Sequence, residues 1–169
     1  MAPVIEKKAL DRMDRKILEV LQKDATRAVG QLADEIGLSK SACWRRIQAL
    51  EQQGIITARV ALLDQRKLGL NLTVYTAIRT LQHTKDWYDV FSNVVTTMPN
   101  VMEVHRMSGE IDYLMRSVVP DMSSYDTMYL DMIENVDLSD VSSSFSMETI
   151  KYSTALPLAY LGTASAENP

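Results

Sequence analysis

The stretch that decides the fold of the N-terminal part runs from residue 37 to residue 56 and reads GLSKSACWRRIQALEQQGII. Gly37 stands where one helix would end, and the hydroxyl of Ser39 can accept the unpaired N–H groups of the next helix. Cys43, Ile47 and Leu50 recur at i, i+4 and i+7, the spacing of an apolar stripe. The stretch therefore predicts a helix over 39–53 that docks on its own domain through this stripe.

The opposite side of this helix indicates contact with nucleic acid. At about 100° per residue, its side chains are Ser41, Arg45, Gln48 and Gln52, which form hydrogen bonds and carry positive charge. This is the layout of a recognition helix for the major groove of double-stranded DNA. The alternative is an ordinary amphipathic surface helix, which a helix with two arginines often is.

The expected DNA contacts divide by role. We expect Ser41, Arg45 and Gln48 to reach base edges, and the basic side chains around them to meet phosphates. For Arg46, a structural pairing with an acid on one of the two preceding helices is an alternative. The full set of expected DNA-binding residues is Ser39, Lys40, Ser41, Trp44, Arg45, Arg46, Gln48 and Arg59.

The flanking segments complete a winged helix-turn-helix over residues 1–63. Apolar periodicity predicts helices over 11–23 and 29–36, and the β-branched and apolar residues of 55–63 predict the β-ribbon of a wing. We expect residues 1–10 to be a mobile arm. Residues 64–71 are expected to form a linker.

The remainder of the chain alternates between strand and helix periods. These periods predict strands over 72–81, 101–107, 111–119 and 138–152, with helices over 86–98 and from Pro120-Asp121 onward. The order βαββαβ indicates a ferredoxin-like sandwich over 72–158, followed by a tail over 159–169, so the whole chain is of the α+β class. The helix faces expected to cover the sheet comprise Trp87, Val90, Phe91, Val94, Val95 and Met98, then Met122, Tyr125, Tyr129, Met132, Ile133 and Val136. The other sheet face needs a partner, so we expect a homodimer.

Charge is distributed unevenly along the 169 residues. The net charge is −4, but residues 1–60 have a balance of +3 and residues 61–169 a balance of −7. The basic part can therefore face phosphates while the acidic part is kept away from them. No apolar run approaches the ~20 residues that span a bilayer, and no leader opens the chain, so we expect a cytoplasmic protein without membrane contact.

The residues do not predict an enzyme, a metal site or a cofactor. A single cysteine, Cys43, excludes an intrachain disulfide and is most simply a small buried hydrophobe. His83 and His105 lie far apart and lack a metal-ligand partner at i+4. The chain also contains no nucleophile motif, phosphate-binding glycine loop or nucleotide fingerprint.

Three separated motifs resemble the leucine-responsive/asparagine-regulator (Lrp/AsnC) family of transcription factors. The first is LDRMDRKIL at 10–18, the second is SGEIDYL at 108–114, and the third is Met147-Glu148 followed by Lys151. The resemblance covers residues 8–158. Two segments, CWRR at 43–46 and VSSSFSME at 141–148, resemble the branch that includes a cysteine-responsive, detoxification-type regulator.

The resemblance implies dimers that assemble into tetramers or octamers and bind an amino acid between dimers. Carried onto this chain, the effector positions are Arg106, Met107, Ser108, Gly109, Asp112, Met122, Ser144, Phe145 and Ser146. The glycine turn, Ser108-Gly109-Glu110, can hold the ligand carboxylate, and Asp112 or a backbone carbonyl can accept its ammonium. An apolar or sulfur-containing side chain of the ligand can be surrounded by Met107, Met122 and Phe145. Leucine, methionine and cysteine are the expected effectors, although the serines of 142–146 depart from relatives that are more apolar there.

Other interpretations of the same residues remain open. Gly109 is required by the turn alone, and Asp112 could cap a strand end or pair across an interface. The sandwich could serve only for oligomerisation, which would make the protein an architectural DNA binder without a ligand. A metabolic subunit with an allosteric sandwich is a further alternative, but it leaves the basic helix without a purpose.

Overall fold

The computed structural model describes residues 10–162, so most of the predicted arm and residues 163–169 of the predicted tail lie outside the described part. The chain divides into two compact units. Unit 1 consists of Met1–Ala61 together with Lys151–Pro169, and unit 2 consists of Leu62–Ile150. Each unit has its own hydrophobic core.

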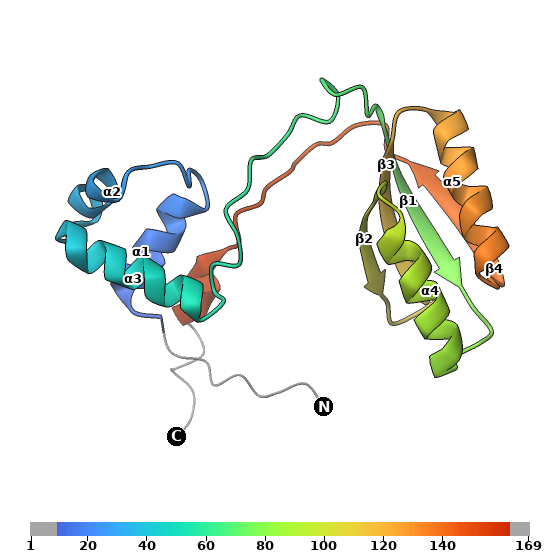
Figure 1. The fold of residues 1–169 in the computed structure, drawn as a ribbon, viewed down its shortest axis with the longest axis horizontal. Coiled ribbons are helices and arrows are strands. Elements are labelled where there is room, and N and C mark those ends of the chain that lie inside the picture. The colour runs from blue at the N-terminus through green and yellow to red at the C-terminus, as the bar shows by residue number, and fades with distance from the viewer. Residues whose placement is uncertain (1–9, 163–169) are drawn as a thin grey trace. The chain divides into compact units, whose positions relative to one another are not determined.

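Unit 1 contains three helices whose ends follow from local sequence. They are α1 (Arg12–Leu21), α2 (Val29–Ile36) and α3 (Lys40–Gln52), as Figure 1 shows. Gly37 ends α2 in the left-handed conformation with φ of +77°, which costs glycine little because it has no Cβ. The hydroxyl of Ser39 caps α3 by accepting a hydrogen bond from the N–H of Ala42 at 3.2 Å. Both predictions from the opening stretch are confirmed.

The core of unit 1 is formed by the inward sides of the three helices. Cys43, Ile47 and Leu50 of α3 are all buried, which confirms the predicted docking stripe. The other buried members are Ile17, Leu18, Leu32, Ala33 and Ile36. Burying such side chains contributes roughly 1.5–3 kcal/mol each for the larger aliphatic ones, so the stripe fixes which side of α3 remains exposed.

The strand predicted for residues 55–63 is wrong. Among the described residues, this segment pairs with no strand, and Val60, Leu62 and Leu63 are 73%, 63% and 75% exposed. The composition is suitable for a strand, but a strand forms only when another strand accepts and donates its backbone hydrogen bonds. The described part of unit 1 supplies no such partner.

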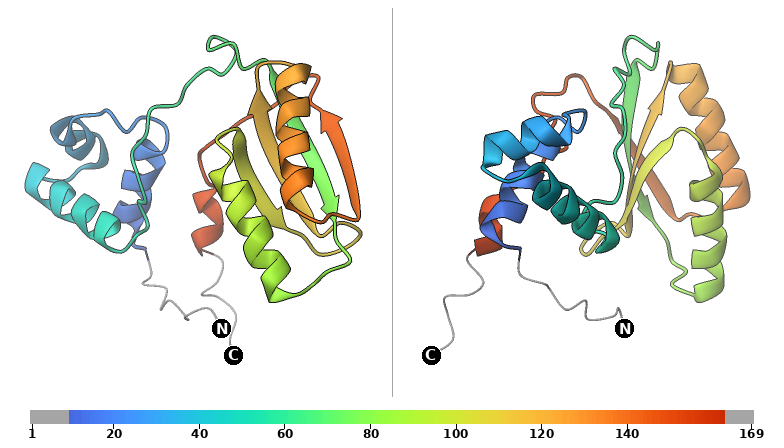
Figure 2. Two further views of the ribbon diagram at one scale, coloured as in Figure 1. Left: turned by 45° about the vertical axis from the view of Figure 1, so that its right-hand side comes forward. Right: turned by 60° about the vertical axis from the view of Figure 1, so that its left-hand side comes forward.

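Unit 2 has the predicted βαββαβ order. Its elements are β1 (Leu72–Arg79), α4 (Lys85–Thr97), β2 (Val101–Arg106), β3 (Tyr113–Val119), α5 (Met122–Asn135) and β4 (Asp140–Phe145). The sheet order is β2-β3-β1-β4 with antiparallel neighbours, which is the ferredoxin-like arrangement. Figure 2 shows that α4 and α5 cover the same face of this sheet.

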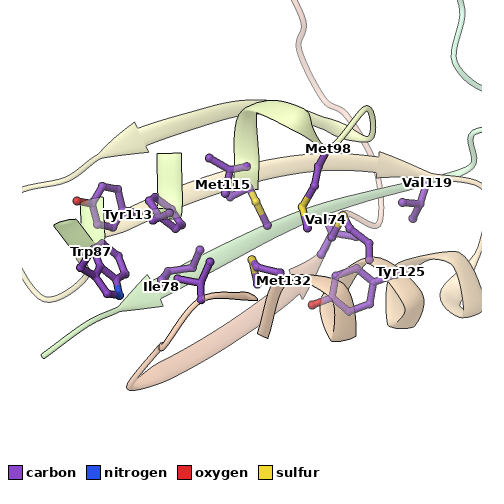
Figure 3. Close-up of a cluster of buried hydrophobic side chains, with 13 residues drawn as sticks. Val74, Ile78, Trp87, Met98, Tyr113, Met115, Val119, Tyr125 and Met132 are labelled. Atoms are coloured by element: carbon purple, nitrogen blue, oxygen red, sulfur yellow. The ribbon is translucent and has the colours of Figure 1, made fainter. Parts of the chain in front are cut away.

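The core of unit 2 lies between the sheet and its two helices (Figure 3). From Val74 in β1 to Thr80, just beyond its end, every second residue is buried, as the period of a half-covered strand requires. Trp87 and Phe91 of α4 stack with ring centroids 5.1 Å apart, and Phe91 approaches Tyr113 of β3 at 4.6 Å. These aromatic contacts fix α4 over the start of β3, which directly follows the glycine turn.

Three residues predicted to face the sheet are exposed instead. Val90 is 49% exposed, Met122 is 55% exposed and Ile133 is 38% exposed. At 3.6 residues per turn, Met122 and Ile133 lie about 60° and 80° around the helix from the buried Tyr125. The buried stripes are therefore narrower than predicted, and Met128 occupies a buried position in α5.

The last strand is shorter than predicted and the chain then leaves the sheet. β4 covers Asp140–Phe145 rather than 138–152, and its ladder ends where the N–H of Ser146 bonds to the carbonyl of Thr73 at 2.9 Å. Beyond this point only Leu72 of β1 is left for pairing, so the ladder cannot continue to residue 152.

The segment that follows β4 returns to unit 1. Its short helix η1 (Leu158–Gly162) lies beside α1 in Figure 1, and Leu158 packs against the unit 1 core. The side chain of Gln22 accepts from the N–H of Leu156 at 2.7 Å and donates to its carbonyl at 3.4 Å. Arg15 donates to the carbonyl of Leu161 at 3.0 Å. Unit 1 is therefore built from two segments that are far apart in the sequence.

Candidate nucleic-acid interface and ligand site

The exposed side of α3 carries side chains suited to DNA. Lys40, Ser41, Trp44 and Arg45 are all exposed, and Trp44 is 52% exposed although it is a large apolar side chain. The hydroxyls of Ser39 and Ser41 lie 3.3 Å apart at the start of the helix. Because α3 docks through the opposite stripe, these side chains are held on a rigid element and directed away from the core.

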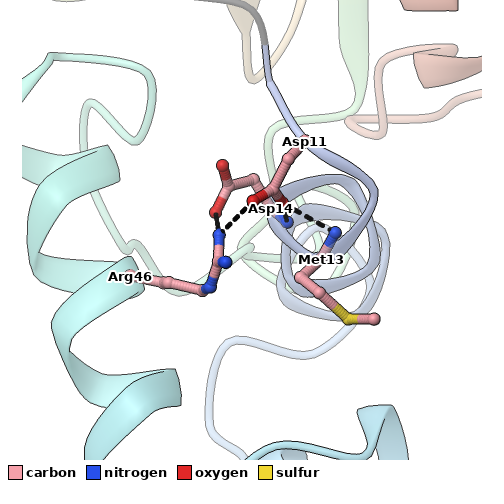
Figure 4. Close-up of polar contacts among 4 residues, drawn as sticks. All are labelled: Asp11, Met13, Asp14 and Arg46. Carbon is pink, nitrogen blue, oxygen red and sulfur yellow. Dashed lines mark hydrogen bonds and ion pairs between the residues drawn. The ribbon is translucent and has the colours of Figure 1, made fainter.

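Arg46 is engaged within unit 1 (Figure 4). Its Nη1 lies 2.6 Å from Oδ2 of Asp11 and 2.8 Å from Oδ1 of Asp14. The hydrogen bonds that Arg46 donates to Asp14 and Asp11 raise the pKa of Arg46. The hydrogen bonds that Asp11 accepts, first from the N–H of Asp14 and then from Arg46, lower the pKa of Asp11. Arg46 thus forms the pairing with acids of the first helix that the sequence offered as an alternative to DNA contact. This pairing joins the start of α1 to the middle of α3.

Gln48 and Arg59 share one carboxylate. The amide nitrogen of Gln48 lies 2.8 Å from Oε2 of Glu51, and Nη2 of Arg59 lies 2.7 Å from Oε1 of the same residue. Gln48 and Arg59 are both among the predicted DNA contacts, but Glu51 is missing from that set. Its i, i+3 spacing from Gln48 on a helix was the available signal.

The turn between β2 and β3 gathers one group of predicted effector residues. Gly109 has φ of +125°, which confirms that the turn itself demands glycine. The N–H of Met107 bonds to the carbonyl of Asp112 at 2.8 Å, and the carboxylate of Asp112 accepts from the N–H of Thr80 at 2.9 Å. Asp112 thus caps the end of β1, while Arg106, Met107, Ser108 and Gly109 remain exposed.

The remaining predicted effector residues lie at the other end of the sheet. Phe145 pairs with Val74, which pairs with Ser117, whereas Arg106 pairs with Tyr113. Tyr113 and Ser117 are four residues apart on β3, about 13 Å at 3.3 Å per residue. Met122, Ser144, Phe145 and Ser146 therefore form a second group, in which the rings of Phe145 and Tyr125 meet edge to face at 5.3 Å. One chain does not bring the two groups together.

The uncovered sheet face carries an ion pair that no sequence pattern indicated. Glu103 of β2 and Arg116 of β3 are register partners, and their closest atoms lie 2.7 Å apart. Hydrogen bonds from Arg116 and then His105 lower the pKa of Glu103. Tyr75 on this face is 43% exposed. The face is thus partly apolar and partly charged, which suits a second protein surface.

Comparison with known proteins covers both units. Residues 10–57 match a winged helix-turn-helix DNA-binding family, and residues 73–156 match the Lrp/AsnC ligand binding domain. The chain is 49% identical over 150 residues to the DNA-binding transcriptional activator DecR of Escherichia coli K12, covering 88% of this chain and 99% of that protein. The chain belongs to the Lrp/AsnC family of transcriptional regulators. It is therefore a DNA-binding regulator with an amino-acid-binding domain, and not an enzyme.

Other relatives extend this comparison. The glutamate uptake regulatory protein of Zymomonas mobilis is 48% identical over 149 residues, covering 88% of this chain and 91% of the relative. An AsnC family regulator from Agrobacterium tumefaciens superposes with a TM-score of 0.86 and 53% identity, covering 89% and 98% of the two chains. A regulator from Neisseria meningitidis in complex with L-methionine superposes with a TM-score of 0.85 and 33% identity, covering 90% and 99%.

Two features are absent from the described residues. No helix among residues 10–162 is long and apolar enough to cross a membrane. Within the same range, no group of three or more His, Cys, Asp or Glu side chains is arranged to hold a metal ion.

Proposed function

We propose that this regulator reads DNA through the exposed side of α3, with Ser41, Arg45 and Gln48 at base edges and Lys40 at a phosphate. The observation that carries the proposal is the orientation of α3, whose apolar stripe is buried while Trp44 and Arg45 project outward. Arg45 has no ion-pair partner among the described residues. Arg46 is assigned to holding α1 and α3 together. Two copies of α3 in a dimer would then enter major grooves about one helical turn, or a multiple of it, apart.

We infer that dimers form through the uncovered sheet face and that a small amino acid binds between dimers. The separation of the predicted effector residues supports this inference: two groups at opposite ends of one sheet can line a single site only if different subunits contribute them. The Neisseria meningitidis regulator, a relative at 33% identity, has been solved with L-methionine bound. Methionine, leucine and cysteine are the proposed ligands, and tetramers or octamers are the proposed assemblies. Because its bacterial relatives are transcription regulators, we propose that the protein works in the cytoplasm.

The ligand site is tested by calorimetric titration of the twenty amino acids. We expect heat with a small apolar or sulfur-containing amino acid, and its loss in both Asp112→Ala and Ser144→Ala, one variant from each residue group. Asp126→Ala on the exposed side of α5 serves as the control. If one variant gives the same heat of binding as the wild type, the residue changed in that variant does not belong to the site. The absence of heat with every amino acid would favour an architectural DNA binder without a ligand.

A further inference from the structure

Glu51 is an acidic residue of α3, the helix that we propose reads DNA. Its carboxylate accepts hydrogen bonds from two other side chains. Its Oε2 accepts a hydrogen bond from Nε2 of Gln48 at 2.8 Å, and its Oε1 accepts one from Nη2 of Arg59 at 2.7 Å. The side chain of Glu51 is one-third exposed, at 33%, and that of Arg59 is 37% exposed. Both oxygens of the carboxylate therefore have a partner, and the three side chains form a chain from Arg59 to Gln48.

The chemistry of this contact fixes the orientation of the Gln48 amide. An ionised carboxylate only accepts hydrogen bonds, so the amide nitrogen and not the amide oxygen of Gln48 must face Glu51. One N–H and the carbonyl oxygen of Gln48 remain available for a further partner. A glutamine that presents one donor and one acceptor side by side is matched to the N7 and N6 groups of adenine in the major groove.

We propose that Glu51 is a positioning residue that makes Gln48 select adenine at one base pair of each half-site. Arg59 holds Glu51 in place, and Glu51 holds the Gln48 amide in the orientation that reads adenine. The proposal rests on the proposed DNA-reading role of α3. It goes beyond that role because it assigns a base and a supporting side chain to one position.

A purely structural role for Glu51 makes a different prediction. Exposed ion pairs contribute little to folding free energy. If Glu51 had only such a structural role, its loss would not change which bases the protein prefers. Loss of the acid would also reduce repulsion of phosphates and strengthen binding to all sequences equally. A change in base preference confined to one position therefore separates positioning from both of these effects.

The experiment measures binding of the full chain to duplexes in which each base pair of a selected site is varied in turn. The site is first obtained by selection from random duplexes with the wild-type protein. The variants are Glu51→Gln, which keeps the size of the side chain but lets its amide donate as well as accept, Gln48→Ala, and the two combined. Glu19→Gln on the exposed side of α1 is the matched control for loss of one negative charge.

We expect wild type to prefer adenine at one position by about tenfold or more, as a bidentate contact provides. Glu51→Gln should reduce that preference to less than about threefold and leave the other positions unchanged, and Gln48→Ala should remove it. The combined variant should match Gln48→Ala, since Glu51 acts through Gln48. Glu51→Asp, which keeps a carboxylate one methylene shorter, should retain part of the preference and guards against misfolding of the amide variant.

Three outcomes would overturn the proposal, two of them because of Glu51 and one because of α3 itself. If wild type prefers certain bases and Glu51→Gln keeps every preference, Glu51 does not position Gln48. The same conclusion follows if Glu51→Gln changes the affinity for all duplexes by one common factor. If wild type shows no base preference at any position, the DNA-reading role of α3 itself fails.

Discussion

At the residue scale, Asp11 performs two tasks with one carboxylate. Its Oδ1 accepts from the N–H groups of Met13 and Asp14 at 2.8 Å each and so caps α1, while its Oδ2 binds Arg46. Hydrogen bonding to the charged form lowers a carboxyl pKa, and the pKa of Asp11 is lowered in this way. The consequence is a link between the protonation of one side chain and the attachment of α1 to α3.

This link predicts a pH dependence of unfolding. Because the folded-state pKa of Asp11 is depressed, its stabilisation is fully present above the unfolded value near ~4 and is lost as pH falls through the lower folded value. We expect the unfolding free energy of the wild type to fall between about pH 6 and 3. In Asp11→Asn, which retains a good N-cap, this fall should be smaller than in the wild type, by less than about 1 kcal/mol. Denaturant titrations at several pH values measure this, with Asp34→Asn on the exposed side of α2 as the control. An unaltered pH profile in Asp11→Asn would show that the link does not exist.

At the element scale, the sequence predicted those features that neighbouring residues determine. Local backbone and side-chain geometry determines four such features. They are the N-cap at Ser39, the end of α2 at Gly37, the buried stripe from Cys43 to Leu50 and the alternating burial in β1. The strand expected at 55–63 was wrong because strand formation depends on a partner that no local pattern reveals. Met122 was misplaced because a helical period gives relative directions but not the width of the buried stripe.

Ser39 allows the cap of α3 to be separated from DNA contact. We expect Ser39→Ala to lower the unfolding free energy by about 1 kcal/mol, since the N–H of Ala42 loses its acceptor. Ser39→Asp should keep the cap and the stability, yet weaken binding to every duplex because its charge repels phosphates. Thermal unfolding and DNA titration of both variants test this. Equal stability of Ser39→Ala and wild type would show that the cap contributes nothing.

At the scale of the whole molecule, residues 151–162 return to the unit that begins the chain. No sequence pattern indicated this docking, because Gln22 and Leu156 are 134 positions apart and their contact uses the backbone of the second partner. The sequence also could not predict that the effector residues fall into two groups. Their places at two ends of the sheet follow from the strand register, which depends on residues that are distant in the sequence.

The docked segment should stabilise unit 1. We expect Gln22→Ala to lower its unfolding free energy by about 1 kcal/mol, because the N–H and carbonyl of Leu156 lose their partner. Gln31→Ala on the exposed side of α2 should change it by less than about 0.5 kcal/mol. Calorimetry of the full chain compares the two variants. Indistinguishable melting curves would show that the segment is not held by Gln22.

The central claim, that α3 reads DNA, is tested most directly by comparing Arg45→Ala with wild type on a selected site and on random duplex. We predict a loss of about 1–3 kcal/mol on the selected site, a smaller loss on random DNA, and a weaker sequence preference. Arg66→Ala, an exposed arginine in unit 2, is the matched control and should leave the preference intact. Equal losses on the two duplexes would reduce Arg45 to a phosphate contact. Unchanged binding of Arg45→Ala to both duplexes would contradict the assignment of α3 as the DNA-reading helix.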